Sequence, residues 1–351
     1  MRSTVTDHPV RAQTPSLADV EVPFVDIRNL NVTFTGGKKP ARAVADLSLQ
    51  VKRGEVVALI GESGSGKSVT LRSVLRLHPP RRSRVEGQIL VDGQDVLQLS
   101  AADLSAFRGG VASMIFQEPL LALDPVYTVG DQIIEAILRH EKIGKTAARA
   151  RALELFERVR IPSPARRLDA YPHEMSGGMR QRAMISLALA SRPKLLLADE
   201  PTTALDATVQ IQILLLLREL QRELGLSVIF VTHDIGAAVE VADRIAVMYA
   251  GRIVEEGPAR TLLRSPRHPY TRALLKSLAH GSVSKGSRLE TIAGSPPDLT
   301  ALPPGCVFAP RCSLALESCR ETLPDITKLS IDHSARCLRL DQTVTVGTVF
   351  A

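Results

Sequence analysis

A glycine-rich stretch, Gly61-Glu62-Ser63-Gly64-Ser65-Gly66-Lys67-Ser68, lies between an apolar run and a helix-like run. Val56 to Ile60 precedes it and predicts a buried strand, and Val69 to Leu77 follows it and predicts a helix. Strand, glycine loop and helix are the setting that a phosphate-binding P-loop requires. The glycines let backbone N–H groups turn toward phosphate oxygens, and the start of the helix adds partial positive charge. The stretch therefore predicts a nucleoside triphosphate site.

Two side chains of this loop suit the chemistry of a bound triphosphate. Lys67 can reach the β- and γ-phosphates, and the Ser68 hydroxyl can ligate Mg²⁺. Val69 opens the helix whose N-terminus would face the phosphates, so it belongs to the same predicted site. A chance Gly/Ser loop is the alternative, and the complete pattern between a strand and a helix argues against it.

An alternating run from Phe24 to Phe34 predicts short strands ahead of the loop, and residues 44–51 predict another. The chain therefore enters its nucleotide site through a β-rich segment. Phe34 can stack on an adenine ring, and it can equally be an ordinary aromatic side chain in the core or at the edge of a sheet. The sequence does not choose between these two interpretations.

Two acidic residues follow a continuous apolar strand predicted over residues 195–198. Carboxylates at the end of a buried parallel strand are placed to manage Mg²⁺ and water. We expect Asp199 to hold Mg²⁺, often through water, and Glu200 to polarise the attacking water as a general base. Two exposed acids at a strand end would be unremarkable in isolation, but the upstream P-loop favours the catalytic interpretation.

Two further polar residues stand at predicted strand ends. Gln117 follows the strand predicted over residues 111–116, where it can touch a bound phosphate or its metal. His233 follows the strand at 228–231, where it can hydrogen-bond a γ-phosphate or position water. Either residue alone would be an ordinary loop residue, and their shared position at strand ends raises both as candidates.

Residues 120–168 have helical periodicity without clear strands and predict a helical insertion. After it, Ser176 is a good N-cap for a helix that runs to Ala190, and Gly177 and Gly178 allow close backbone approach. This second helix start is a second anion site. Within one domain it has nothing obvious to bind, so we expect it to face a nucleotide held by a partner. Downstream, Asp206 can cap a helix that Gly225 ends.

The bulk composition is that of a folded protein. The 351 residues are 44% hydrophobic and 23% charged, and the chain has no apolar run of the roughly 18 residues that a membrane-spanning helix requires. The N-terminus lacks an apolar signal-peptide core, which leads us to expect a cytoplasmic location. The net charge is +7, but aromatic content is 3% with no Trp, so we expect no nucleic-acid partner.

All four cysteines fall near the end of the chain: Cys306, Cys312, Cys319 and Cys337. In a cytosolic protein such a local group favours a metal or a cluster over disulfides. The spacing C-x5-C-x6-C-x17-C lacks the tight C-x2-C pairs usual for zinc. Chemistry alone leaves open an iron–sulfur cluster, Zn²⁺ and free thiols, with the cluster favoured.

Together these motifs stand in the order of an ABC-transporter ATPase and resemble it closely over about residues 24–280. Gly61–Ser68 resembles the Walker A loop, Gln117 the Q-loop and Leu195–Glu200 the Walker B strand. The signature, D-loop and H-loop are resembled by Ser176-Gly177-Gly178-Met179-Arg180-Gln181, by Ala204-Leu205-Asp206 and by His233.

Met179 replaces the Gln of the common signature, a substitution familiar in the peptide-transport branch. Other stretches resemble the same dipeptide/oligopeptide importer ATPases, namely Gln117-Glu118-Pro119, His268-Pro269-Tyr270-Thr271 and Gly305-Cys306-Val307-Phe308-Ala309-Pro310-Arg311-Cys312. The resemblance implies ATP and Mg²⁺ as cofactors and a [4Fe–4S] cluster on the four cysteines. It also implies that Ser176, Gly177, Gly178, Gln181 and Asp206 complete the site of a facing subunit.

The implied fold is an α/β P-loop NTPase with a RecA-like core, an antiparallel β subdomain and an α-helical subdomain at about 118–190. We expect a flexible tail over residues 1–22, the ATPase domain over 23–280 and a small cysteine-containing C-terminal extension over 281–351. The implied partners are two transmembrane permease subunits, a second ATPase subunit in a heterodimer and an extracytoplasmic peptide-binding protein. The implied location is peripheral, on the cytoplasmic face of the cell membrane.

Several alternatives remain at this stage. The same ATPase can serve a transporter for glutathione, an opine or nickel. A soluble ABC protein acting on DNA or ribosomes is a second alternative, but the long coiled-coil insertion and the second cassette typical of those proteins are missing from this sequence. A regulatory module that uses the cysteine tail as a sensor is a third. Intact Lys67, Asp199, Glu200 and His233 argue for catalysis instead.

Overall fold

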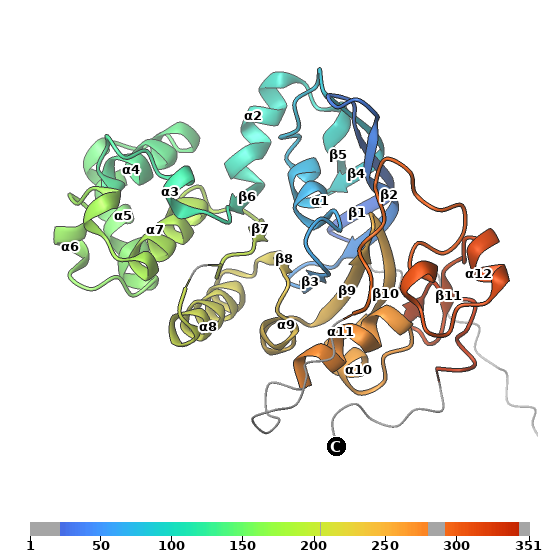
Figure 1. Cartoon of the computed structure of the whole chain (residues 1–351). Helices are drawn as coiled ribbons and strands as arrows, with labels where there is room; N and C mark the ends of the chain where they lie inside the picture. The colour runs from blue at the N-terminus through green and yellow to red at the C-terminus, as the bar shows by residue number, and fades with distance from the viewer. Residues whose placement is uncertain (1–21, 204, 280–291, 344–351) are drawn as a thin grey trace, which may run out of the picture.

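The computed structural model describes residues 22–203, 205–279 and 292–343. The tail predicted over residues 1–22 lies outside these ranges except for Val22, and so does Ala204 of the predicted D-loop. Within the described ranges the chain forms two β-sheets, a lobe of helices and a C-terminal region of short elements (Figure 1).

The larger sheet carries the strand that leads into the P-loop. Its eight strands in the described ranges are, in order across the sheet, β11 (Thr327–Lys328), β12 (Ser334–Ala335), β10 (Arg252–Pro258), β9 (Arg244–Tyr249), β3 (Val56–Ile60), β8 (Ser227–Thr232), β7 (Leu195–Asp199) and β6 (Ala112–Ile115). The strands from β9 to β6 are parallel to one another, so their carboxyl ends meet at one edge of the sheet. The strands β9 and β10 pair antiparallel as a hairpin.

The smaller sheet is antiparallel and lies beside the P-loop helix. Its order is β2 (Ala41–Val51), β1 (Val25–Phe34), β4 (Ser83–Val91) and β5 (Gln94–Asp95). Where the sequence predicts several short strands, β1 is one strand whose register shifts between Ile27 and Leu30. Asn29 lies at the shift with a φ of 48°, a conformation that Asn tolerates better than most residues.

The predicted helical insertion is confirmed as a separate lobe (Figure 1). The helix α4 is amphipathic, and its side chains Ile133, Ile134 and Ile137 face the interior. The Thr128 hydroxyl caps this helix by accepting the N–H of Asp131 at 3.1 Å. The lobe contains α3 (Pro119–Ala122), α4 (Val129–His140), α5 (Lys145–Arg158), α6 (Pro164–Arg167), η3 (Pro172–Glu174) and α7 (Gly177–Leu189).

The other helices cover the sheets or belong to the C-terminal region. Ser100 caps the helix that begins at Ala101, because its Oγ accepts the N–H of Asp103 at 3.2 Å. These helices are α1 (Lys67–Val74), η2 (Val96–Gln98), α2 (Ala101–Gly110), α8 (Ala207–Leu224), α9 (Ile235–Val241), α10 (Ala259–Arg264), α11 (Pro269–Ala279), η5 (Ala309–Arg311) and α12 (Glu317–Glu321).

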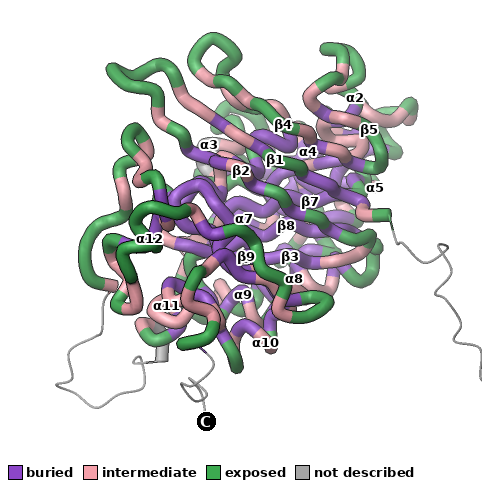
Figure 2. The backbone as a smooth tube through the Cα atoms, turned by 90° about the vertical axis from the view of Figure 1, so that its right-hand side faces the viewer, coloured by how far each residue is buried: buried purple, intermediate pink, exposed green. Residues whose placement is uncertain are grey.

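Apolar side chains cover both faces of the larger sheet, as a mainly parallel sheet requires. Successive residues of β3 illustrate this, because Ala58 belongs to one core cluster and Leu59 to the other. Figure 2 shows this sheet as a largely buried layer. None of the helices in the described ranges combines the length and apolar character needed to cross a bilayer.

Candidate functional site

The glycine loop joins the end of β3 to α1, as the sequence predicts. Two of its glycines are required by close backbone approach. A Cβ on Gly61 would lie 2.1 Å from the Met248 carbonyl oxygen, and one on Gly66 would lie 2.4 Å from the Ala43 oxygen. Gly66 also has a φ of 104°, which side-chain-bearing residues rarely adopt. The loop therefore has a fixed shape pressed against β9 and β2.

Lys67 is 4% exposed and turns back over the loop. Its Nζ donates to the carbonyl oxygens of Gly61 at 2.8 Å and Glu62 at 2.9 Å. Burial lowers the pKa of this ammonium, while the carboxylates of Glu200, Asp199 and Glu62 oppose that shift. The lysine therefore lies in the glycine loop itself, among the carboxylates of the site.

Ser68 and Asp199 form the candidate Mg²⁺ site. The Ser68 hydroxyl donates to Asp199 Oδ1 at 2.6 Å, and the Asp199 carboxylate is fully buried at the end of β7. Asp199 Oδ2 has no hydrogen-bond partner among the described residues, and the nearest cation is Arg72 at 3.8 Å. Burial raises the pKa of Asp199. A buried, unsatisfied carboxylate oxygen beside a hydroxyl fits an oxygen-preferring divalent cation.

Three side chains converge on one oxygen of Glu200. Thr203 Oγ1 donates to Glu200 Oε2 at 2.9 Å, His233 Nδ1 lies 3.2 Å from it and Gln117 Nε2 lies 3.4 Å from it. Glu200 itself has a φ of 45°, a strained conformation of the kind that occurs at functional sites. The contacts fix the orientation of a carboxylate that is 16% exposed.

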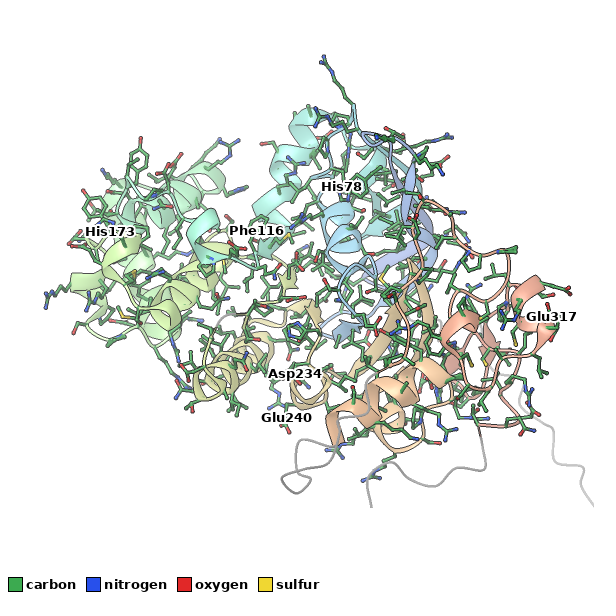
Figure 3. All side chains as sticks on the ribbon, in the orientation of Figure 1. His78, Phe116, His173, Asp234, Glu240 and Glu317 are labelled. Atoms are coloured by element: carbon green, nitrogen blue, oxygen red, sulfur yellow. The ribbon has the colours of Figure 1, made fainter. Side chains whose placement is uncertain are left out.

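Lys67, Ser68 and Glu200 line one cavity of about 700 Å³, a size suited to a small ligand, whereas Asp199 is not among its lining residues. Phe116, labelled in Figure 3, is the first residue after β6, and the next residue, Gln117, lines the cavity. The predicted site residues that line it are Ser63, Gly64, Gly66, Lys67, Ser68, Val69, Gln117, Glu200 and His233.

The sequence prediction for Phe34 remains untested by this geometry. Phe34 ends β1 and is not among the residues that line the cavity. Its ring packs edge-to-face on His78, with centroids 5.5 Å apart. The side chain is partly buried against the core between the sheets.

The predicted second anion site lies in the helical lobe and not at the P-loop cavity (Figure 1). Ser176 caps α7, because its Oγ accepts the N–H of Met179 at 3.3 Å. Ser176 and Gly177 are exposed and Gly178 is half-buried. Gln181 is 1% exposed, so its side chain points into this lobe and away from solvent. Asp206 is exposed and caps α8 through the N–H of Val209 at 3.0 Å.

The four cysteines line one small and largely apolar cavity in the C-terminal region. The N–H of Arg339 donates to the sulfur of Cys337 at 3.3 Å. Burial raises the pKa of Cys306 and of Cys312, and nearby backbone N–H groups oppose that rise. Burial raises the pKa of Cys337 to about 11. In the described ranges, no three His, Cys, Asp or Glu side chains are grouped closely enough to hold a single metal ion.

The sequence reasoning missed three residues around the P-loop. Leu299 lines the nucleotide cavity, Tyr270 Oη accepts the N–H of Glu62 at 2.9 Å, and Arg311 pairs with the Glu62 carboxylate. Tyr270 and Arg311 stand in stretches that the resemblance singled out, which was a signal of their importance without a role. Leu299 carries no such signal.

A P-loop, a Ser68–Asp199 pair with a buried carboxylate and an oriented glutamate at the edge of a parallel sheet define a P-loop ATPase. The helical lobe, in which Ser176 caps the start of α7, gives it the form of an ABC cassette. The chain belongs to the ABC transporter ATP-binding proteins. The ABC transporter family model matches residues 44–203, and that of the oligopeptide/dipeptide transporter C-terminal region matches residues 254–319.

Relatives match over nearly the whole chain. A protein named as a probable peptide ABC transporter ATP-binding protein of Sinorhizobium fredii is 45% identical over 336 residues, covering 95% of this chain and 99% of the relative. The dipeptide transport ATP-binding protein DppD of Bacillus subtilis is 46% identical, covering 91% of this chain and 95% of its own. The OppD protein of Mycobacterium tuberculosis is 47% identical, but the match covers 52% of its length.

The fold matches solved ABC cassettes. The cassette MJ0796, solved as a dimer, superposes with a TM-score of 0.61 at 31% identity, covering 67% of this chain and 99% of that protein. A second structure of MJ0796 is described as a post-hydrolysis state with ADP and Pi. The predicted fold class and ATPase activity are therefore confirmed.

Proposed function

We propose that this chain is the ATP-hydrolysing subunit of an ABC importer that takes up di- or oligopeptides. The observation that carries the proposal is that Lys67, Ser68 and Glu200 line one cavity, with the buried Asp199 carboxylate directly behind Ser68 and hydrogen-bonded to it. The peptide assignment is supported by the names of the relatives and by the match of the C-terminal region.

The glycine loop and Lys67 would hold the triphosphate, with the N-terminus of α1 adding favourable charge. Ser68 and Asp199 would hold Mg²⁺, and Gln117 lies where it can reach the ion or a bound phosphate. The ion supplies neutralisation of phosphate charge. Phe34 at the end of β1 is a proposed contact for the adenine ring.

Glu200 is the proposed general base for the attacking water. Its Oε2 accepts a hydrogen bond from Thr203 and lies within 3.4 Å of His233 Nδ1 and Gln117 Nε2. His233 is 64% exposed on the cavity side, where it can also hydrogen-bond a γ-phosphate. The contacts to Glu200 hold it at the edge of the sheet where the phosphates would end.

A second ATPase subunit completes the proposed site. The exposed N-terminus of α7 at Ser176, Gly177 and Gly178 would face the nucleotide of the facing subunit, and Asp206 would lie beside it. Gln181 is buried in the lobe, so we propose that it supports the N-terminus of α7 and does not contact the nucleotide directly. ATP would then favour the closed pair through contacts with both subunits.

The remaining partners and the location follow from the importer assignment. We infer two membrane permease subunits, a heterodimeric ATPase partner, an extracytoplasmic peptide-binding protein and a peripheral position on the cytoplasmic face of the membrane. We also propose the division into a 1–22 tail, a 23–280 ATPase domain with its helical subdomain at about 118–190, and a 281–351 extension.

We propose that Cys306, Cys312, Cys319 and Cys337 hold a [4Fe–4S] cluster. Four thiols around one cavity, with the Arg339 N–H donating to the sulfur of Cys337, form a donor set that suits a cluster. The spacing C-x5-C-x6-C-x17-C lacks the tight C-x2-C pairs usual for Zn²⁺. Because burial raises the pKa of the Cys306, Cys312 and Cys337 thiols, loading of the site would release protons.

The cluster proposal is tested by anaerobic purification of the full chain followed by iron, sulfide and zinc analysis. About four irons and four sulfides per chain with visible absorption are expected. Replacement of Cys319, the most buried of the four, by Ser should remove them. Zinc in place of iron, or a colourless protein without metal, would contradict the proposal.

The importer proposal is tested by affinity purification of the tagged chain from detergent-solubilised membranes, with mass spectrometry of the proteins that accompany it. Two multi-span permeases, a second ATPase and a peptide-binding protein are expected. Recovery with ribosomes or nucleic acid, or without any partner, would contradict it. A binding protein that takes nickel, glutathione or an opine would keep the ATPase and refute the peptide assignment.

A further inference from the structure

The cysteine-bearing C-terminal region reaches the P-loop through one side chain. Arg311 ends the 3₁₀ turn η5 and directly precedes Cys312. Its two terminal nitrogens bond the two oxygens of the Glu62 carboxylate, Nη1 to Oε2 at 2.7 Å and Nη2 to Oε1 at 3.1 Å. This paired geometry gives an Arg–carboxylate contact both strength and direction. The two residues are 249 positions apart in the sequence.

Arg311 is itself held in place. Its side chain is 5% exposed, and its remaining hydrogen-bonding capacity is used by the chain around it. Nε donates to the Ala293 carbonyl at 3.0 Å, Nη2 to the Ile292 carbonyl at 3.1 Å and Nη1 to Tyr249 Oη at 3.2 Å. Because these hydrogen bonds hold the Arg311 guanidinium in one position, it can hold the Glu62 carboxylate in one position as well.

Glu62 in turn carries backbone groups on which the loop depends. Its N–H donates to Tyr270 Oη at 2.9 Å, and its carbonyl oxygen accepts from Lys67 Nζ at 2.9 Å. The same oxygen accepts the N–H of Ser65 at 3.2 Å. Glu62, which pairs with Arg311, therefore also positions Lys67 and closes the turn of the glycine loop.

We propose that Arg311 is a positioning residue for the phosphate-binding loop, and that through Glu62 it makes ATP affinity depend on the cysteine-bearing region. The inference rests on the proposed nucleotide site. Without the Arg311–Glu62 contact, the loop would spend part of its time in conformations that do not bind phosphate. The apparent affinity for ATP would then fall in proportion to the fraction of molecules whose loop is in the binding conformation. Coupling between two sites is reciprocal, so nucleotide bound at the loop would also stabilise the position of Arg311 before Cys312.

The test is a double-mutant cycle on the purified full-length protein, with the Kd of a fluorescent ATP analogue and Mg²⁺ as the readout. The variants are Arg311→Gln, Glu62→Gln and the two combined. Each single substitution is expected to raise Kd about tenfold, and the combined variant should be no weaker than either single one, because both remove the same contact. Arg311→Lys should restore only part of the affinity, since it lacks the paired geometry.

Glu55→Gln is the matched control. Glu55 lies just before β3, whereas Glu62 lies just after it. The Glu55 carboxylate is also paired with an arginine: Arg244 Nε donates to Oε1 at 2.9 Å and Nη2 donates to Oε2 at 3.2 Å. This pair lies at the other end of the strand, away from the glycine loop. The control variant should bind nucleotide like the wild type.

The outcomes separate this inference from the proposed function. Wild-type affinity in either single variant would overturn the inference, and so would multiplied effects in the double variant. Weak binding in Arg311→Gln with normal binding in Glu62→Gln would also overturn it, because the effect would then come from damage near Cys312. Failure of the wild-type protein to bind nucleotide would instead refute the proposed ATP site.

Discussion

The Ser68 hydroxyl donates a 2.6 Å hydrogen bond to Asp199 Oδ1, joining the first turn of α1 to the end of β7 across 131 positions of sequence. Asp199 is fully buried, and its other carboxylate oxygen has no hydrogen-bond partner among the described residues. A buried carboxylate oxygen without a hydrogen-bond partner is costly, and the Mg²⁺ ion that we propose for this site would offset that cost. We therefore expect the Asp199 charge to destabilise the free chain and to stabilise the complex with Mg²⁺ and nucleotide.

The first prediction concerns the stability of the nucleotide-free protein at neutral pH. Asp199→Asn removes the buried charge and should raise the free energy of unfolding on the order of 1 kcal/mol, or Tm by about 2–4 °C. The same variant should lose the stabilisation that Mg²⁺ with nucleotide gives the wild type. Both effects are measured by thermal unfolding with and without Mg²⁺ and nucleotide.

Asp243→Asn is the matched control, with the opposite expected sign. Burial alone would raise the pKa of Asp243, but hydrogen bonds from Arg218 and from the Val56 N–H hold it below its usual value. Its charge is therefore stabilising, and its loss should lower Tm. Destabilisation by Asp199→Asn, or full Mg²⁺-dependent stabilisation in that variant, would contradict the first prediction.

The second prediction concerns pH and the same carboxylate. Burial raises the pKa of Asp199 in the folded chain above its ordinary value of 3.8, so the unfolded chain loses its proton first as pH rises. The contribution of Asp199 is therefore most favourable below pH 3.8 and declines as pH rises through the raised pKa. Denaturant unfolding across this window should show a shallower decline for Asp199→Asn than for wild type. Parallel curves would contradict the assignment.

The third prediction concerns the glycine loop. Gly66→Ala puts a Cβ 2.4 Å from the Ala43 oxygen at a φ of 104° and should cost about 2–4 kcal/mol of unfolding free energy. Gly64→Ala is the control, because its φ of 79° is also unfavourable but its Cβ meets nothing within 4 Å. It should cost only about 1–2 kcal/mol. Equal costs in chemical denaturation would show that the loop is not pressed against β2.

The fourth prediction concerns the start of α8. Asp206→Ala removes the side-chain acceptor for the Val209 N–H and should lower the free energy of unfolding by about 1 kcal/mol. Asp206→Asn keeps an acceptor and should be close to wild type, as measured by urea unfolding. A loss of similar size in both variants would mean that the negative charge matters and that the cap does not.

Much of the site was predictable because its determinants are local or follow from one rule of topology. The caps at Ser176 and Asp206 each act on an N–H three residues ahead, so sequence alone reveals them. Gln117 and Glu200 follow parallel strands, and parallel strands end at a common edge. That rule brings together residues 83 positions apart.

The rest depends on contacts that no local pattern encodes. Arg311 and Glu62 pair across 249 positions of sequence, and no pattern in either segment predicts that it contacts the other. β12 has two residues, too few for a periodic pattern, yet it extends the larger sheet by pairing with β10. The burial of Gln181 was likewise hidden, since its neighbours in the resembled signature point to a ligand role.

Uptake of labelled di- and oligopeptides by cells shows whether Glu200 drives the ATP hydrolysis that powers peptide uptake. The cells would carry the wild-type chain, Glu200→Gln or the exposed control Glu223→Gln as their only copy. Glu200→Gln should assemble and bind ATP but turn it over at least about 100-fold more slowly, so that uptake is lost. The control should transport normally. Wild-type uptake by the Glu200→Gln cells would show that Glu200 is not the general base.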